Sequence, residues 1–213
     1  MKAKQKFLQA SPDEKANIFT HFVGLVFFVF ITPVLIFRSV HVENIMISLA
    51  VALFGICLIA MYLSSTFYHL EPSGTIKHQL RKLDHVCIFL LIAGSYTPFV
   101  SIFFNDTEGI NLLLGIWLIA ILGSLFKLFF TGKLRFLSTI AYLLTGWAAI
   151  FMGERIINDL PSDVLLFIGV GGAFFSLGTV FYMLKRLKFS HSVWHIFVVL
   201  GNLAHSYALW LSL

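Results

Sequence analysis

The chain has 213 residues, of which 59% are hydrophobic and only 12% are charged, and its mean hydropathy is +0.91. A soluble domain is closer to half apolar and a quarter charged, so this composition excludes an ordinary soluble protein and indicates an integral membrane protein. The formal net charge is +5. Because the basic residues lie in short loops, we interpret this excess as a topological signal, with the lipid bilayer and not a nucleic acid as the partner.

Seven apolar segments are each long enough, or nearly so, for the ~20 residues that a bilayer requires. None carries Asp, Glu, Lys or Arg in its central part, and the connections are short. We therefore predict an all-α, multi-pass protein of the cell membrane, with a single domain over residues 1–213. Its seven transmembrane helices are expected at about 17–37, 44–68, 84–104, 110–128, 135–153, 162–184 and 191–212.

The distribution of basic residues predicts the orientation of this bundle. The end that we expect to face outward has only two basic residues, Arg38 and Arg155, together with six acidic residues. Since cytoplasmic loops are rich in Lys and Arg, we expect the N-terminus in the cytoplasm and the C-terminus outside. Thirteen of the 15 Lys and Arg residues fall at the predicted inner end: Lys2, Lys4, Lys6, Lys15, Lys77, Arg81, Lys82, Lys127, Lys133, Arg135, Lys185, Arg186 and Lys188.

The first segment begins with a capping box at residues 11–14, in which Ser11 is the N-cap, Pro12 the first helical residue and Glu14 the third. Glu14 also begins a polar stripe with Asn17 and His21, at i, i+3 and i+7 of an otherwise apolar helix. Polar stripes in membrane helices usually face the bundle interior. Two interpretations stay open: a cap and structural contact, or residues that support the ligands of a functional site from behind.

The second and third segments carry the next polar residues. Ser65 and His69 are four residues apart near the end of the second segment, so a helix places them on one face. Asp84 opens the third segment and is followed by His85. A plain interpretation of Asp84 is an N-terminal acid that interacts favourably with the helix dipole.

The last segment opens with His191 and His195, again one turn apart, at the spacing that lets two imidazoles bind one metal ion. The predicted orientation places both at the inner end, together with His69 and Asp84. His205 lies 14 residues beyond His191, roughly 21 Å deeper by helical rise, and is therefore a poor partner. The two cysteines, Cys57 and Cys87, form no CxxC motif, so a metal here should use imidazole and carboxylate.

Three imidazoles and one water form the open tetrahedral site that is typical of catalytic Zn²⁺. Asp84 would hold that water and take its proton, and Ser65 would hydrogen-bond the water or a substrate oxyanion. The alternative is that His69, His191 and His195 only hydrogen-bond neighbouring helices, because a lone HxxxH pair is a weak signal.

Three short motifs in chain order resemble those of the hemolysin III family, the bacterial branch of the progestin and adipoQ receptor superfamily. The stretch IAGSYTPF at 92–99 fits the same branch, and the resemblance covers essentially the whole chain. Each motif is loose alone, but the three together at the matching helix ends are specific. They are Glu14-x2-Asn17-x3-His21, Ser65-x3-His69 with Leu83-Asp84-His85 downstream, and His191-x3-His195.

The resemblance implies a seven-helix bundle with a cytoplasmic N-terminus. In the similar adiponectin receptors, three histidines hold zinc and an aspartate contacts it through water; by motif these are His69, His191, His195 and Asp84 here. The similarity to alkaline ceramidases, which hydrolyse a lipid amide with zinc, favours a ceramidase-like amidase. One departure is His85, where the receptors tend to have another residue.

Three functions follow from these features. The first is a zinc-dependent membrane hydrolase acting on a lipid amide or ester, with membrane lipid as the substrate. The second is a non-enzymatic sensor or regulator of membrane state, in which zinc joins helices structurally. The third is a channel or cytolytic protein, as the family label hemolysin suggests. A pore would favour polar residues along the full depth, whereas only Asn202, His205 and Ser206 lie deeper in the last segment.

Overall fold

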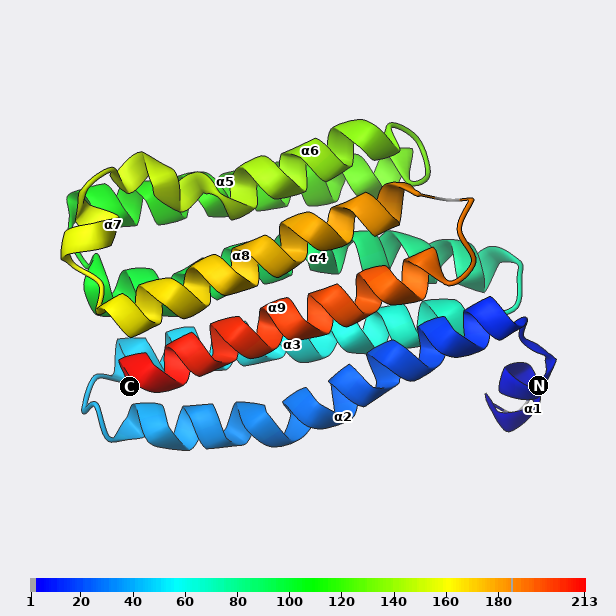
Figure 1. The fold of residues 1–213 in the computed structure, drawn as a ribbon, viewed down its shortest axis with the longest axis horizontal. Coiled ribbons are helices and arrows are strands. Elements are labelled where there is room, and N and C mark those ends of the chain that lie inside the picture. The colour runs from blue at the N-terminus through cyan, green and yellow to red at the C-terminus, as the bar shows by residue number, and fades with distance from the viewer. Residues whose placement is uncertain (1–2, 185) are drawn as a thin grey trace.

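The computed structural model describes residues 3–184 and 186–213, which form helices and short connections without any strand (Figure 1). Two of the basic residues that we expect at the inner end, Lys2 and Lys185, lie outside the described residues. The elements are α1 (Ala3–Gln9), α2 (Pro12–Val40), α3 (Ile45–Leu70), α4 (Thr75–Phe103), α5 (Thr107–Phe130), α6 (Arg135–Gly146), the 3₁₀ helix η1 (Ala148–Met152), α7 (Arg155–Asn158), α8 (Ser162–Met183) and α9 (Ser190–Ser212).

Six helical segments are long and apolar enough to cross a membrane: α2, α3, α4, α5, the α6–η1 segment and α8. α9 has 23 residues but is not one of the six, because its histidine, asparagine and serine side chains lower its hydropathy. Large apolar side chains also point outward along these helices. Phe30, Phe37 and Phe129 are 71%, 70% and 79% exposed, as expected of residues that face lipid.

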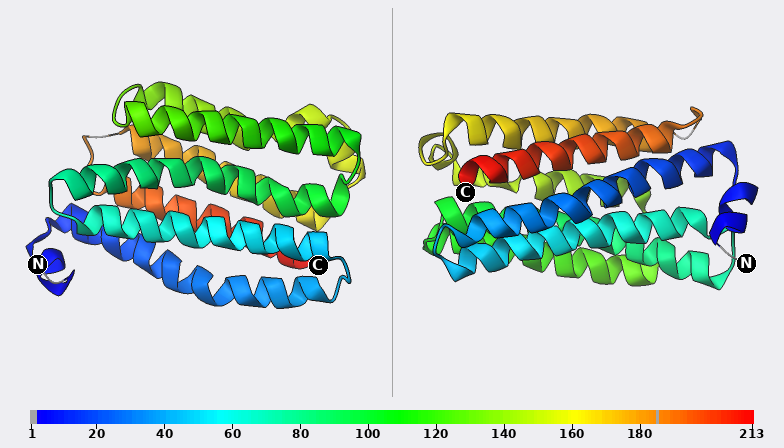
Figure 2. Two further views of the ribbon diagram at one scale, coloured as in Figure 1. Left: turned by 180° about the vertical axis from the view of Figure 1, so that it is seen from behind. Right: turned by 90° about the horizontal axis from the view of Figure 1, so that it is seen from below.

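The long helices run along one common axis, and the two ends of the chain lie at opposite ends of the bundle (Figures 1 and 2). α2, α3, α4 and α5 pack as successive neighbours, while α9 packs against both α8 and α2. The first and last long helices are therefore adjacent. The end of the bundle that holds the N-terminus also holds the α3–α4, α5–α6 and α8–α9 connections; we call it the N-terminal end.

The start of α2 confirms half of the predicted capping box. The Ser11 hydroxyl accepts a hydrogen bond from the Glu14 backbone N–H at 3.2 Å, and Pro12 is the first helical residue. The Glu14 side chain does not accept the second hydrogen bond of a capping box, from the Ser11 backbone N–H. It points into the bundle, toward α3 and α4.

The predicted start of the third transmembrane helix, at residue 84, was wrong. α4 begins at Thr75, nine residues before the predicted start at 84, so Asp84 lies well inside the helix and cannot act as its N-terminal acid. The physical reason is that hydropathy marks only the part of a helix that lies in lipid. The backbone hydrogen bonds of α4 continue through the polar and basic first turns, which water or lipid headgroups can solvate.

The predicted helix over 135–153 is also not continuous. α6 ends at Gly146, and a short 3₁₀ helix follows Trp147. The Tyr96 hydroxyl of α4 donates to the Gly146 carbonyl at 2.7 Å and accepts from the Ala149 N–H at 3.1 Å. A broken helix is tolerated at membrane depth when other groups satisfy the freed backbone atoms, and Tyr96 does so here.

Two short helices, α1 and α7, had not been predicted. Arg155, the first residue of α7, pairs with Asp106 at 2.6 Å, Glu108 at 2.8 Å and Asp159 at 3.1 Å. The Arg155 guanidinium thereby lowers the pKa of the Asp106 carboxyl. The pairs with Asp106 and Glu108 join α7 to the α4–α5 connection and the first turn of α5, at the end of the bundle opposite the N-terminus.

Glycine lets α8 and α9 approach closely at one place. A Cβ added at Gly171 would overlap the His205 ring and lie 3.1 Å from the Gly201 carbonyl, whereas a Cβ at Gly169 would meet nothing within 4 Å. We therefore expect Gly171→Ala to reduce the free energy of unfolding by about 1–3 kcal/mol through overpacking. The measurement is the melting temperature of the purified protein in detergent.

Gly169→Ala is the matched control, on the same helix and with the same added methyl group. Because alanine favours a helix over glycine by roughly 0.5–1 kcal/mol, its melting temperature should equal or exceed that of the native chain. Equal melting temperatures for the two variants would contradict a packing role for Gly171.

Candidate metal centre

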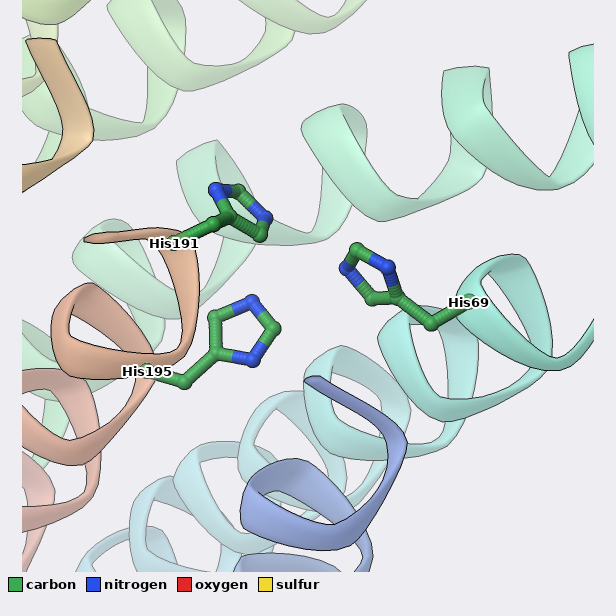
Figure 3. Close-up of side chains that lie close together, drawn as sticks. All are labelled: His69, His191 and His195. Atoms are coloured by element: carbon green, nitrogen blue, oxygen red, sulfur yellow. The ribbon is translucent and has the colours of Figure 1, made fainter. Parts of the chain in front are cut away.

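Three histidines from two helices face one another at the N-terminal end of the bundle. His69 lies in the last turn of α3, and His191 and His195 lie in the first turns of α9 (Figure 3). One ring nitrogen of each lies within 4.8 Å of the other two. The ring centroids are 5.1 Å apart for His69–His191 and for His69–His195, and 4.5 Å apart for His191–His195.

His69 is oriented by a carboxylate on the first long helix. Its Nδ1 lies 2.6 Å from Glu14 Oε2. Because a carboxylate only accepts hydrogen bonds, Nδ1 carries the proton and Nε2 keeps a lone pair. This Nε2 is buried and has no hydrogen-bond partner within the described residues. A histidine whose far nitrogen donates to a carboxylate is the usual arrangement of a metal ligand.

Glu14 is itself held by two further contacts. Asn17 Nδ2 donates to its Oε2 at 3.2 Å, and Lys77 Nζ donates to its Oε1 at 3.3 Å. Lys77 is fixed in turn by a 2.7 Å bond to the Glu71 carbonyl. The carboxylate that orients His69 therefore joins α2, α3 and α4.

His195 is oriented by Thr20, a residue that the sequence analysis missed. Thr20 Oγ1 lies 3.1 Å from His195 Nδ1 and also 2.9 Å and 3.0 Å from the carbonyls of Ala16 and Asn17. Since the single hydroxyl proton goes to a carbonyl, Thr20 accepts from Nδ1–H of His195. The Nε2 of His195 then keeps its lone pair. Thr20 directly precedes His21, but a threonine that bonds its own helix gives no separate signal in sequence.

The remaining residues of the predicted polar stripe also contact α9. The His21 ring stacks on the His195 ring, with centroids 3.5 Å apart and planes at 22°. The Ser192 hydroxyl donates to Asn17 Oδ1 at 2.6 Å, in the buried interface between α2 and α9. The stripe of Glu14, Asn17 and His21 therefore faces the bundle interior and supports the histidines.

These residues fit the zinc ion that the sequence resemblance implies. His69 and His195 each use Nδ1 for a hydrogen bond and direct an uncommitted Nε2 toward a shared space, and His191 completes the group. Neutral imidazole nitrogens are ligands that Zn²⁺ prefers. Three of them leave a fourth position open, which is the pattern of catalytic and not of closed structural sites.

A cavity of about 570 Å³ extends from the histidines into the bundle. Ser65 and Asp84 both line it, as do Glu14, Asn17 and His21. Asp84 Oδ2 lies 3.7 Å from His85 Nδ1, which is 2.7 Å from the Arg81 carbonyl. Asp84 is not one of the residues whose ligand atoms lie close together, which are His69, His191 and His195. The structure therefore places Asp84 on the cavity lining but outside the histidine cluster.

His205 lies elsewhere in the bundle. Its Nε2 donates to the Ile168 carbonyl of α8 at 3.2 Å. Three turns of α9 separate it from the histidine cluster, as its sequence position indicated. Asn202, one turn nearer, donates to the Tyr62 hydroxyl at 2.9 Å. Both side chains are thus engaged with neighbouring helices.

Several known proteins are similar to this chain over most of its length. The family model described as "Haemolysin-III related" matches residues 9–206. The "Hemolysin-3 homolog" of Bacillus subtilis (strain 168) is 34% identical over 195 residues, covering 90% of each chain. "Hemolysin-3" of Bacillus cereus is 33% identical over 200 residues, covering 92% of this chain and 90% of the relative.

More distant relatives also match. The human "Monocyte to macrophage differentiation factor" is 26% identical over 164 residues, covering 74% of this chain and 68% of the relative. No solved structure matches. Since the family match includes all of α2 through most of α9, the chain belongs to the haemolysin-III related family, as a multi-pass protein of the cell membrane.

Proposed function

We propose that this protein is a zinc-dependent membrane hydrolase that acts on a lipid amide or ester. The observation that carries the proposal is the position of three histidines, with uncommitted nitrogens, at one end of a cavity inside an apolar bundle. His69, His191 and His195 would hold the metal. When bound in such an open site, zinc supplies Lewis acidity, which polarises a carbonyl group and makes water a nucleophile at neutral pH.

The side chains around the histidines have the roles that hydrolysis requires. Glu14 and Thr20 fix the rings of His69 and His195 in one tautomer. Asp84 would accept the proton that water loses as it attacks the carbonyl carbon. Ser65 would donate its hydroxyl proton in a hydrogen bond to the developing oxyanion. Both of these side chains line the cavity, so a bound substrate can reach them.

The cavity supports a lipid as the substrate. Its volume falls within the ~300–1,000 Å³ that is usual for small-molecule sites. Away from the histidines its lining includes Leu91, Phe99, Met152, Leu160 and Phe175, which suit an acyl chain. Its polar residues are concentrated at the N-terminal end, where a carbonyl group would react.

A regulator with structural zinc is the second candidate, and one observation favours it. The contacts Glu14–His69, Thr20–His195 and Ser192–Asn17 already join α2 to α3 and α9, and zinc would add a direct link between α3 and α9. A channel, which the name of the bacterial relatives suggests, has less support. Asn202 and His205, deeper in the bundle, are paired with Tyr62 and Ile168.

We further propose that α9 is a seventh membrane span and that the N-terminal end of the bundle faces the cytoplasm. α9 packs along α8 and α2 and has a comparable length. The N-terminal end carries Lys77, Arg81, Lys127 and Lys133 among its basic residues, while Glu43, Asp106 and Glu108 are at the other end. This asymmetry is the positive-inside pattern.

The topology can be tested with cysteines, because Cys57 and Cys87 are both buried. A membrane-impermeant maleimide applied to intact cells should label Glu154→Cys, at the outer end, but not Ser73→Cys, in the α3–α4 connection. Ser73→Cys should react only after permeabilisation. The native chain is the control for background labelling, and the opposite pattern would reverse the orientation.

Metal content tests the site itself. Protein purified without chelator should contain about one zinc per chain by mass spectrometry. His69→Ala, His191→Ala and His195→Ala should each remove it, because two imidazoles and water hold zinc far less tightly. Glu14→Gln should keep the ligands but weaken zinc affinity by roughly 10–100-fold, since it removes a charged partner of His69.

His78→Ala is the matched control for these variants. His78 is exposed at the same end of the bundle and does not line the cavity, so its loss should leave zinc content unchanged. A native protein that contains no metal, or one that loses no metal in the three histidine variants, contradicts the proposed site.

Hydrolysis separates the enzyme from the regulator. Zinc-loaded protein should release fatty acid from a ceramide or from a diacyl phospholipid in detergent micelles. Asp84→Asn should slow turnover by roughly 10²-fold or more, because the asparagine cannot take up the proton, while zinc content stays at the native value. Absence of turnover by zinc-loaded native protein with both substrate types would contradict the hydrolase and favour structural zinc.

A further inference from the structure

Four basic side chains line the cavity at the N-terminal end of the bundle, beyond the histidine cluster. Arg81 comes from α4, Lys127 from the last turn of α5, Lys133 from the α5–α6 connection and Arg135 from the first residue of α6. From the sequence alone, these residues contributed only to the predicted orientation of the bundle in the membrane. The structure places all four on the lining of one cavity, with Lys127 buried and Lys133 exposed.

Lys127 is the most unusual of the four, because only 2% of its surface is exposed. Lysine is almost never fully buried unless it is paired. Among the described residues, no carboxylate forms an ion pair with Lys127, Arg81, Lys133 or Arg135. Arg81 is close enough for its charge to act on Lys127. Two like charges in a partly dehydrated place are unfavourable unless an anion joins them.

Both arginines are held in place without an acidic partner. The Arg81 guanidinium lies over the α5–α6 turn, where a Cβ on Gly132 would be 3.2 Å from its Nη1. The Arg135 guanidinium lies over the Tyr182 ring, 3.7 Å from its centroid. The buried Nε of Arg135 has no hydrogen-bond partner in the part of the chain that the structure describes. The donors are thus positioned, and some remain available.

Other lysines at the same end of the bundle do find acids. Lys6 pairs with Glu71 at 2.5 Å, and Lys77 pairs with Glu14 at 3.3 Å. Fewer acidic side chains than basic side chains lie near Arg81, Lys127, Lys133 and Arg135. Asp84 lines the same cavity, and Glu14 is already bonded to Asn17, His69 and Lys77. Positive charge therefore exceeds negative charge in this part of the cavity lining.

We propose that Arg81, Lys127, Lys133 and Arg135 bind the phosphate group of an anionic membrane lipid, whose acyl chain extends into the cavity. Guanidinium and ammonium groups from several helices suit the oxygens of a phosphate. The apolar remainder of the cavity suits the chain attached to it. The inference rests on the proposed function in that a lipid enters the cavity, but it requires neither metal nor turnover.

Lipid binding in detergent, measured by native mass spectrometry, tests this site. The native protein should retain dioleoyl phosphatidic acid at least roughly tenfold more tightly than dioleoyl phosphatidylcholine, since the accessible anionic phosphate forms charge-assisted hydrogen bonds. The double variant Arg81→Gln plus Lys127→Met should lose most of this preference. Lys127→Arg, which keeps the charge, should retain it.

Lys82→Met is the matched control, because Lys82 lies next to Arg81 in the sequence but does not line the cavity. Its lipid preference should be unchanged. The melting temperature and zinc content of every variant show whether the bundle still folds. Native zinc content with lost lipid preference in the double variant separates the headgroup site from the metal site.

Two competition experiments identify the source of the anion. Inorganic phosphate that displaces the bound lipid only at much higher concentration supports a lipid headgroup with an attached chain, whereas equal competition overturns it in favour of free phosphate. Equal retention of phosphatidic acid and phosphatidylcholine by native protein, or unchanged preference in the double variant, also overturns the proposal. None of these outcomes depends on hydrolysis, so the headgroup site stands or fails separately from the enzyme.

Discussion

The hydrogen bond between the Glu14 carboxylate and His69 is the interaction on which the organisation of the site depends. It crosses from α2 to α3, fixes the tautomer of one histidine and leaves that ring's other nitrogen without a partner among the residues that the structure describes. A carboxylate inside a membrane bundle is costly unless it is paired. Lys77 and Asn17 supply those pairs, and through Lys77 and His69 this one side chain links α2 to both α4 and α3.

The sequence predicted the helices and the histidine group for different physical reasons. Apolar length reports the part of a helix that lies in lipid, so six of the seven predicted spans coincide with long apolar helical segments. The first turns of α4 and the break after Gly146 were not predicted. The break depends on the Tyr96 hydroxyl, a contact 50 residues away in the chain, which no local pattern contains. The histidines could be grouped because turn-by-turn depth follows from helical rise once the orientation is assumed. Thr20 could not be found that way, since its role depends on which neighbour takes its proton.

The basic residues show that the side chains behind one sequence pattern can have two different roles. Their number at one end predicts orientation, and that signal needs only a count along the chain. Which of them pair with acids, as Lys6 and Lys77 do, and which line a cavity, as Arg81 and Lys127 do, depends on packing between helices. A charge that serves insertion into the membrane can therefore also remain available in the folded bundle, where its unpaired state is visible only in three dimensions.

The site combines residues of α2 and α9, which lie far apart in the sequence, and this separation has a consequence for biosynthesis. Glu14 and Thr20 are synthesised well before His191 and His195, and Asp13 accepts a hydrogen bond from the backbone N–H of Phe189 just before α9. Chains are synthesised and inserted from the N-terminus. A nascent bundle that ends before α9 contains His69 and its partner Glu14 but lacks the other two histidines. Tight metal retention would thus mark a chain whose synthesis and insertion have extended through the start of α9.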